Sequence, residues 1–222
     1  EIEIALQVEA RPTGFNRLNT LWWVLTLLRL STGARLRMPV VSDTAFSCIA
    51  ESSTEPTMWP IETLPRQLHT MPDPPEVIGE KELLWVRQAF GPGSELMNDE
   101  AFGRAFQTFD DVIWAHSSGS AIVMTWAALE TLIRPGRSDI TKRLASSLAV
   151  LLEPPGAERE RLFQQIKLLY ETRGSSAHAS RSPGAQQLFE SLDVARRAFI
   201  ACIDNREVPK VETLYEMWRL KR

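Results

Sequence analysis

Two side chains five positions apart, Arg173 and His178, are suited together to acid–base chemistry on an anion. An imidazole has an unperturbed pKa of about 6.5, so it exchanges protons near neutral pH. A guanidinium keeps its positive charge and presents a planar fork of donors. The small residues 174–177 between them would let two helix ends approach closely, so that both side chains reach one cleft. The alternative is an arginine favoured by a helix dipole and a histidine on a solvated turn.

A third candidate, Glu130, lies in the run 121–133, which is apolar almost all round. Burying a carboxylate is costly unless a cation or a hydrogen-bond donor meets it. We therefore expect Glu130 either to orient Arg173 or His178, or to form a structural ion pair with an arginine such as Arg143.

The elements that must hold these residues are predicted to be helices. From Glu80 onward, apolar residues recur with a helical period, and cap residues or Gly and Pro separate the runs. A short helix is expected from Glu80 to Phe90, ended by Gly91-Pro92-Gly93, and the run 121–133 should be central. Further helices are predicted to begin at Asn98 or Asp99, at Ser138 or Asp139, after Pro155, at Ser182-Pro183 and at Val211.

The first 79 residues follow different patterns. Apolar residues alternate over 1–10 and predict a strand, whereas 18–28 repeats at helical spacing and stops at Thr32-Gly33. A second strand is expected over 36–41. The many prolines in 51–77 remove backbone donors and indicate a linker or an irregular segment.

These elements together predict a mostly α fold. The expected architecture is a C-terminal antiparallel helical bundle over 80–222, preceded by a small N-terminal α+β segment with a Pro-rich connection over 1–79. A composition with 44% hydrophobic and 24% charged residues supplies enough apolar material for a buried core and excludes a disordered tail.

The charge distribution is uneven. Up to Ile133 there are 9 Lys and Arg against 17 Asp and Glu, giving −8, and the remainder has 16 against 11, giving +5, which together recover the net charge of −3. An acidic average speaks against a general nucleic-acid coat protein. The basic C-terminal half is suited to an anionic ligand, unless both halves present ordinary solvated faces.

Several other classes of protein are excluded or disfavoured. The apolar stretch 18–28 is about half the length that spans a bilayer, so no membrane span is expected. Cys48 and Cys202 form no CxxC or Cys/His cluster, which argues against a disulfide scaffold or structural zinc and favours a reducing cytoplasm. Because the sequence starts at Glu1 rather than Met, further residues are expected upstream.

Common catalytic motifs are absent from the sequence. There is no GxxxxGK[ST], GxGxxG after a strand, GxSxG or HExxH, and the three histidines are scattered. We therefore expect neither a metal nor a cofactor. His69 and His116 are assigned solvated or capping roles.

A series of short motifs resembles a known family. The run Trp126-Ala-Ala-Leu-Glu130 is followed by Arg143-Leu-Ala, then by Tyr170-Glu-Thr-Arg173 and His178. This order and spacing over about 120 residues resembles the Apea-like branch of the HEPN superfamily, which consists of helical bundles marked by Arg-x(4–6)-His. The first 90 residues resemble no family we can name.

The chain also departs from that branch. Gly174 and Ala179 stand where the branch usually has Ser and Gly, and Ser175 or Ser176 would have to replace the missing polar neighbour of the motif Arg. Ser180 occupies the position at which HEPN toxins controlled by nucleotidyl transfer carry Tyr, which argues against that type of regulation.

The resemblance implies a metal-independent endoribonuclease that acts as a dimer. His178 would exchange protons as the 2′-hydroxyl attacks the adjacent phosphate, and Arg173 would stabilise the developing negative charge. One such pair cannot easily serve both sides of the phosphorus, so a two-fold dimer would supply the second pair. Tyr170 would stack on a base or pack in the core.

Three interpretations therefore remain open. The leading one is a cytoplasmic toxin or antiviral defence effector that cleaves RNA, forms a homodimer and is controlled by a regulatory or neutralising protein. The second is a non-catalytic HEPN module that dimerises and binds RNA, a nucleotide or a partner protein, which Gly174 and the acidic pI of about 5.7 favour. The third is an accidental motif on a bundle that only mediates assembly.

Overall fold

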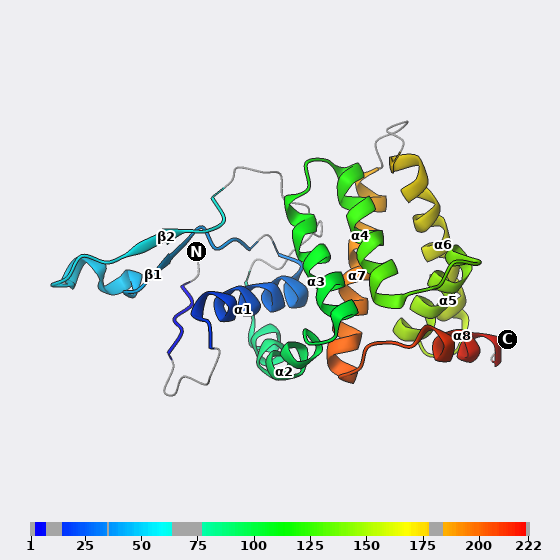
Figure 1. The fold of residues 1–222 in the computed structure, drawn as a ribbon, viewed down its shortest axis with the longest axis horizontal. Helices are drawn as coiled ribbons and strands as arrows, with labels where there is room; N and C mark the ends of the chain where they lie inside the picture. Colours follow the sequence, from blue (N-terminus) through cyan, green and yellow to red (C-terminus); the bar gives the residue numbers. More distant parts are fainter. Residues whose placement is uncertain (1–2, 8–14, 35, 64–76, 178–183, 221–222) are drawn as a thin grey trace.

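A computed structural model describes residues 3–7, 15–34, 36–63, 77–177 and 184–220, with the side chains of 174–177 left out. Helices make up most of the described chain, and a two-stranded ribbon lies near its N-terminal end (Figure 1). The predicted class, mostly α with a small N-terminal α+β segment, is confirmed.

The elements follow one another as α1 (Arg17–Thr32), β1 (Val40–Ser42), the 3₁₀ helix η1 (Phe46–Glu51), β2 (Met58–Pro60), α2 (Glu80–Leu96), α3 (Glu100–Asp110), the 3₁₀ helix η2 (Asp111–Trp114), α4 (Ser118–Ile133), α5 (Ile140–Leu152), α6 (Ala157–Ala177), α7 (Ala185–Asn205) and α8 (Val211–Leu220).

Several helix ends lie where the sequence predicted them. The Asp99 carboxylate accepts hydrogen bonds from the backbone N–H groups of Ala101 and Phe102, both at 2.9 Å, and so begins α3. Gly33 ends α1 with a positive φ of 67°, and its N–H donates to the Arg29 carbonyl at 2.8 Å. The last helix, Val211–Leu220, begins at the predicted residue.

Helix α4 lies at the centre of the bundle, as its apolar run predicted. It packs against α3, α6 and α7, while α5 packs against α6 and α8 (Figure 1). The largest fully buried side chains come from α1 and α3 to α7: Trp126, Phe102, Phe106, Phe199, Leu27, Ile122, Leu129, Leu132, Ile133, Leu144, Leu148 and Ile166.

Helix α1 shares this core with the later helices. It packs against α2 and α7, and the Trp23 ring lies 5.2 Å from the Phe106 ring between centroids. The contact of α1 with α2 is close, because a Cβ on Gly93 would lie 2.7 Å from the Trp23 ring. The division of the chain into 1–79 and 80–222 stays a prediction.

The short ribbon extends away from the helices (Figure 1). Strands β1 and β2 are antiparallel, with Val41 opposite Trp59. Strand β2 lies within the Pro-rich stretch that the sequence analysis assigned to a linker, and β1 begins four residues later than the strand predicted over 36–41. Residues 64–76 of the Pro-rich stretch lie outside the described residues.

The predicted first strand is wrong over residues 3–7. These residues form no strand, and the apolar side chains of Ile4 and Leu6 are exposed. A strand needs a neighbour for its backbone groups, and no described strand pairs with this segment. Instead, the Glu3 carboxylate accepts a hydrogen bond from the Phe46 N–H at 2.9 Å.

Two predicted helix ends are also wrong. Helix α2 continues through Gly91-Pro92-Gly93 to Leu96, with Val86, Ala89 and Gly93 as its buried positions. Helix α6 continues past Arg173 to Ala177, although the small residues 174–177 were expected to interrupt it. The predicted start of α7 at Ser182-Pro183 lies outside the described residues, and the described helix begins at Ala185.

Candidate functional site

The candidate site lies where α4 and α6 pack together. Glu130 is near the C-terminal end of α4, and Tyr170 and Arg173 are one helical turn apart on α6. Because residues three apart on a helix share a face, both α6 side chains reach the same carboxylate.

One oxygen of Glu130 joins these three side chains. The Tyr170 hydroxyl donates to Glu130 Oε1 at 2.9 Å, and Arg173 Nη2 lies 3.3 Å from the same oxygen. The Arg173 guanidinium carbon lies 5.6 Å from the centre of the Tyr170 ring, within cation–π range. Trp126, one turn before Glu130, meets the Tyr170 ring edge-on at 5.4 Å between centroids.

The cluster is partly open to solvent. The side chains of Arg173 and Glu130 are 33% and 28% exposed. Burial, with the hydrogen bond to Glu130 as a second cause, raises the pKa of Tyr170 to about 12. Tyr170 therefore keeps its proton at neutral pH and remains a donor to Glu130. Two buried donors, Arg173 Nε and Trp126 Nε1, have no hydrogen-bond partner among the described residues.

These contacts decide between the two partners expected for Glu130. Its cation is Arg173, whereas Arg143 lies 3.6 Å from Glu212 and 5.3 Å from the centre of the Tyr215 ring. The structure thus brings together three predicted site residues, Glu130, Tyr170 and Arg173.

The other predicted site side chains, those of His178, Ser175 and Ser176, lie outside the described part of the structure. His178 lies outside the described residues, so its position relative to Arg173 stays a prediction. Ser175 and Ser176 belong to the last turn of α6, and their side chains also lie outside the described part of the molecule. His69 is likewise outside it, and His116 is exposed.

A second polar cluster, around Arg29 on α1, was missed by the sequence analysis. The Arg29 guanidinium lies 2.8 Å from Glu62 and 3.2 Å from Asp110, and it also donates to the Leu36 carbonyl. Trp22 Nε1 donates to the other oxygen of Asp110 at 2.9 Å. The available signal was a guanidinium at the end of a long apolar run, since a buried charge needs a partner.

Burial dominates the electrostatics of this second cluster. The Arg29, Glu62 and Asp110 side chains are all at least 87% buried. Desolvation raises the pKa of Asp110, although Arg29 and the Trp22 donor oppose it. Arg29 contacts both carboxylates, so the cluster connects α1 to the C-terminal end of α3 and to the segment after β2.

No metal centre is found among the described residues, and the buried one of the two thiols is a poor nucleophile. No three His, Cys, Asp or Glu side chains there are grouped closely enough to hold a metal ion. Burial raises the pKa of the Cys202 thiol to about 12, which makes it a poor nucleophile. In the same ranges, no helix has the length and apolar composition needed to cross a bilayer.

No protein-family model, curated protein or solved structure matches this chain. The resemblance to the HEPN superfamily therefore depends on the sequence motifs described above.

Proposed function

We propose that this protein is a metal-independent endoribonuclease of the HEPN type, with Arg173 and His178 in its active site. The observation that carries the proposal is the shared contact of Glu130 Oε1 with Tyr170 and Arg173. This contact holds a partly exposed guanidinium near the C-terminal end of α6, five residues before His178 in the sequence.

The proposed reaction is attack of an RNA 2′-hydroxyl on the neighbouring phosphate. The imidazole of His178 accepts or returns the proton, and the 5′-oxygen of the next nucleotide leaves. The guanidinium of Arg173 donates hydrogen bonds to the phosphate oxygens, where negative charge develops. Glu130 and Tyr170 are positioning residues, because they hold Arg173 and need not touch the substrate. The products would be a 2′,3′-cyclic phosphate and a free 5′-hydroxyl.

We further propose that the active form is a homodimer. A second Arg173 and His178 pair in the same groove would supply the acid when the first supplies the base. Cleavage should then depend on protein concentration, with a midpoint that matches the dimerisation midpoint measured by sedimentation.

The cellular role is proposed from the resemblance alone. Such a nuclease would work in the cytoplasm as a toxin or antiviral defence effector, and a regulatory or neutralising protein would hold it inactive.

The decisive experiment uses total RNA and tRNA as substrates in the presence of EDTA. Wild-type protein should cleave both, and His178→Ala and Arg173→Lys should each lose about a hundredfold or more in rate. Two matched controls should cleave like wild type: His116→Ala, because His116 is exposed, and Arg161→Lys, because Arg161 is 75% exposed on the same helix as Arg173. DNA should remain intact, since it has no 2′-hydroxyl.

Undiminished cleavage by His178→Ala would reject this function, as would cleavage that needs a divalent metal. The end-group analysis adds an independent check. Products that carry a 3′-phosphate without a cyclic intermediate, or a 5′-phosphate, would exclude attack by the 2′-hydroxyl.

One observation favours the second candidate, a non-catalytic HEPN module. Glu130 already balances the charge of Arg173, which weakens the attraction of this guanidinium for phosphate. In that case RNA, a nucleotide or a partner protein would bind without turnover. Binding to labelled RNA that persists in an Arg173→Ala, His178→Ala double variant, together with absent cleavage by wild type, would support the module.

A further inference from the structure

The outer face of α2 carries exposed apolar side chains. Leu83 and Leu84 are 53% and 51% exposed, and Phe90, about two turns further along the helix, is 37% exposed. The opposite face, which includes the buried positions Val86 and Ala89, packs against α1 and α7 (Figure 1). Exposed apolar side chains gathered on one surface and flanked by charged residues are typical of a contact between proteins.

Two charges of opposite sign flank the leucines on this outer face. Glu80 and Arg87 are both exposed, and no described residue forms an ion pair or a side-chain hydrogen bond with either of them. They are seven positions apart on α2, a rise of about 10 Å, which is too far for an ion pair within one helix. The midpoint of the interval between them falls between Leu83 and Leu84.

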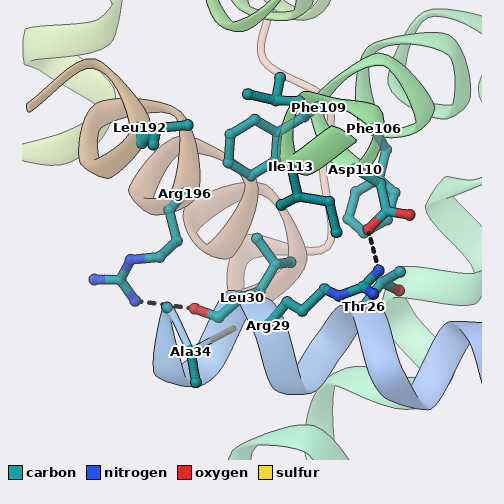
Figure 2. Close-up of a pocket in the computed structure, with 12 residues that line it drawn as sticks. Thr26, Arg29, Leu30, Ala34, Phe106, Phe109, Asp110, Ile113, Leu192 and Arg196 are labelled. Atoms are coloured by element: carbon teal, nitrogen blue, oxygen red, sulfur yellow. Dashed lines mark hydrogen bonds and ion pairs between the residues drawn. The ribbon is translucent and has the colours of Figure 1, made fainter. Parts of the chain in front are cut away.

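Elsewhere in the molecule, charged side chains of this kind join neighbouring elements. Figure 2 shows Arg29 on α1 paired with Asp110 at the end of α3, at 3.2 Å. Glu80 and Arg87 supply the same combination of carboxylate and guanidinium, but no described element covers them. Because exposed charges are also stable in water, the argument depends on their spacing around the leucines and not on the lack of a partner.

From this spacing we infer that the outer face of α2 binds a second copy of this chain. When two α2 helices lie antiparallel, with a two-fold axis beside Leu83 and Leu84, Glu80 lies opposite Arg87 of the second copy. The same symmetry places Arg87 opposite Glu80 of the second copy, so one contact forms two ion pairs. The leucines of both chains meet between these pairs and are removed from water. A parallel arrangement in register would place like charges opposite each other.

This contact is separate from the one proposed at Arg173. Helix α2 packs against α1 and α7, whereas Arg173 lies on α6, which packs against α4, α5 and α7. The inference therefore does not depend on the proposed function, and its tests measure molecular mass instead of cleavage. When both contacts form, the assembly contains more than two chains, and loss of the α2 contact leaves the other contact in place.

Sedimentation equilibrium of the full chain measures the association. A contact between two single helices is at the small end of protein interfaces, so the mass should rise over the micromolar range. Leu84→Glu places a charge at the centre of the contact and should weaken the association about tenfold or more. The matched control, Leu220→Glu, changes a residue 82% exposed on α8 and should associate like wild type. Equal masses of Leu84→Glu and wild type at every concentration would overturn the inference.

Charge reversals test the antiparallel arrangement. Glu80→Arg places two arginines opposite each other at both ion pairs, and Arg87→Glu places two glutamates there. Each variant alone should therefore associate at least about threefold more weakly than wild type. In a mixture of the two variants, opposite charges face each other again at both positions, so the mixed pair should associate about as tightly as wild type. A mixed pair no tighter than either variant alone would overturn the inference.

A fluorescent label on one variant lets sedimentation observe the mixed pair. Cys48 is suitable for the label, because it is exposed and lies outside α2, whereas Cys202 is buried.

A double variant separates charge pairing from changes in the helix itself. Glu80→Arg removes an acidic residue from the first turn of α2, where a negative charge interacts favourably with the helix dipole. The Glu80→Arg, Arg87→Glu double variant has the same change in the first turn but restores opposite charges across the contact, so it should associate like wild type. Association as weak as that of Glu80→Arg alone would show that pairing plays no part and would overturn the inference.

Discussion

Glu130 on α4 and Arg173 on α6 form an ion pair at 3.3 Å, 43 positions apart in the sequence. The same Glu130 oxygen accepts a hydrogen bond from the Tyr170 hydroxyl. The carboxylate therefore holds both Tyr170 and Arg173, which lie one turn apart on the same face of α6. Arg173, the predicted catalytic arginine, is thus held by Glu130, which was itself predicted as a site residue.

Glu130→Gln should distinguish the role of Glu130 in positioning Arg173 from its contribution to the stability of the fold. The amide oxygen can still accept the Tyr170 hydroxyl, but the charge opposite Arg173 is lost. Because the pair is partly exposed, the free energy of unfolding should fall by about 1 kcal/mol at most. If Arg173 is catalytic, kcat should fall up to about a hundredfold with little change in KM.

The control for this prediction is Glu212→Gln, which alters an ion pair at a residue 75% exposed and should leave cleavage unchanged. Tighter RNA binding by Glu130→Gln without any cleavage would indicate that Glu130 competes with phosphate, as the binding-module alternative expects.

Alkaline conditions should weaken the fold through Tyr170. Its pKa is about 12 in the folded protein and about 10 when unfolded, so between these values the folded state binds more protons. Stability from this difference is complete below pH 10 and is lost as the pH rises toward 12. Urea unfolding at pH 9 and pH 11 should show a smaller decline for Tyr170→Phe than for wild type. Equal declines would contradict the raised pKa.

Removing Arg29 should be strongly destabilising. Arg29→Met leaves the buried carboxylates of Glu62 and Asp110 without their cation, and the free energy of unfolding should fall by about 3 to 5 kcal/mol. Arg104→Met is the matched control, because its ion pair with Glu100 is exposed and should contribute less than about 1 kcal/mol. Urea unfolding measures both, and equal losses would show that the Arg29 cluster is solvated.

Two glycines in α2 should respond differently to alanine. At Gly93 the new Cβ would lie 2.7 Å from the Trp23 ring, so Gly93→Ala should lose about 1 to 3 kcal/mol. At Gly91 a new Cβ meets nothing within 4 Å apart from its chain neighbours and the backbone of its own helix, but the ring of Pro92 crowds the Cβ of the residue before it, which offsets the gain in helix propensity. Gly91→Ala should therefore change the free energy of unfolding by less than about 1 kcal/mol. Thermal unfolding of both variants checks this, and equal losses would argue against the close contact of Gly93 with Trp23.

Local signals in the sequence predicted those features that depend only on residues close to one another in the chain. The Asp99 cap, the positive φ at Gly33 and the apolar run of α4 each depend on neighbours within a few residues. The same run predicted that Glu130 needed a cation, because a carboxylate on a mostly buried helix cannot remain unpaired without cost.

The predictions from sequence were wrong or incomplete where contacts between distant elements determine the structure. Gly91-Pro92-Gly93 is a strong local stop, yet α2 continues because Gly93 allows close approach of Trp23 on α1. The alternating segment at residues 3–7 had the pattern of a strand but found no described partner. The choice of Arg173 over Arg143 as the partner of Glu130 likewise depended on how α4 and α6 pack, which no local pattern contains.

The position of α1 limits how the protein can be divided. Trp23 lies against Phe106, and the Trp23 indole donates to the Phe90 carbonyl on α2. After a protease cut between η1 and α2, the two fragments should therefore remain associated. Removal of the N-terminal fragment would expose an aromatic surface to solvent and promote aggregation. A truncated protein that lacks the N-terminal part with α1 should for this reason be insoluble, and the remaining helices should not form a soluble bundle.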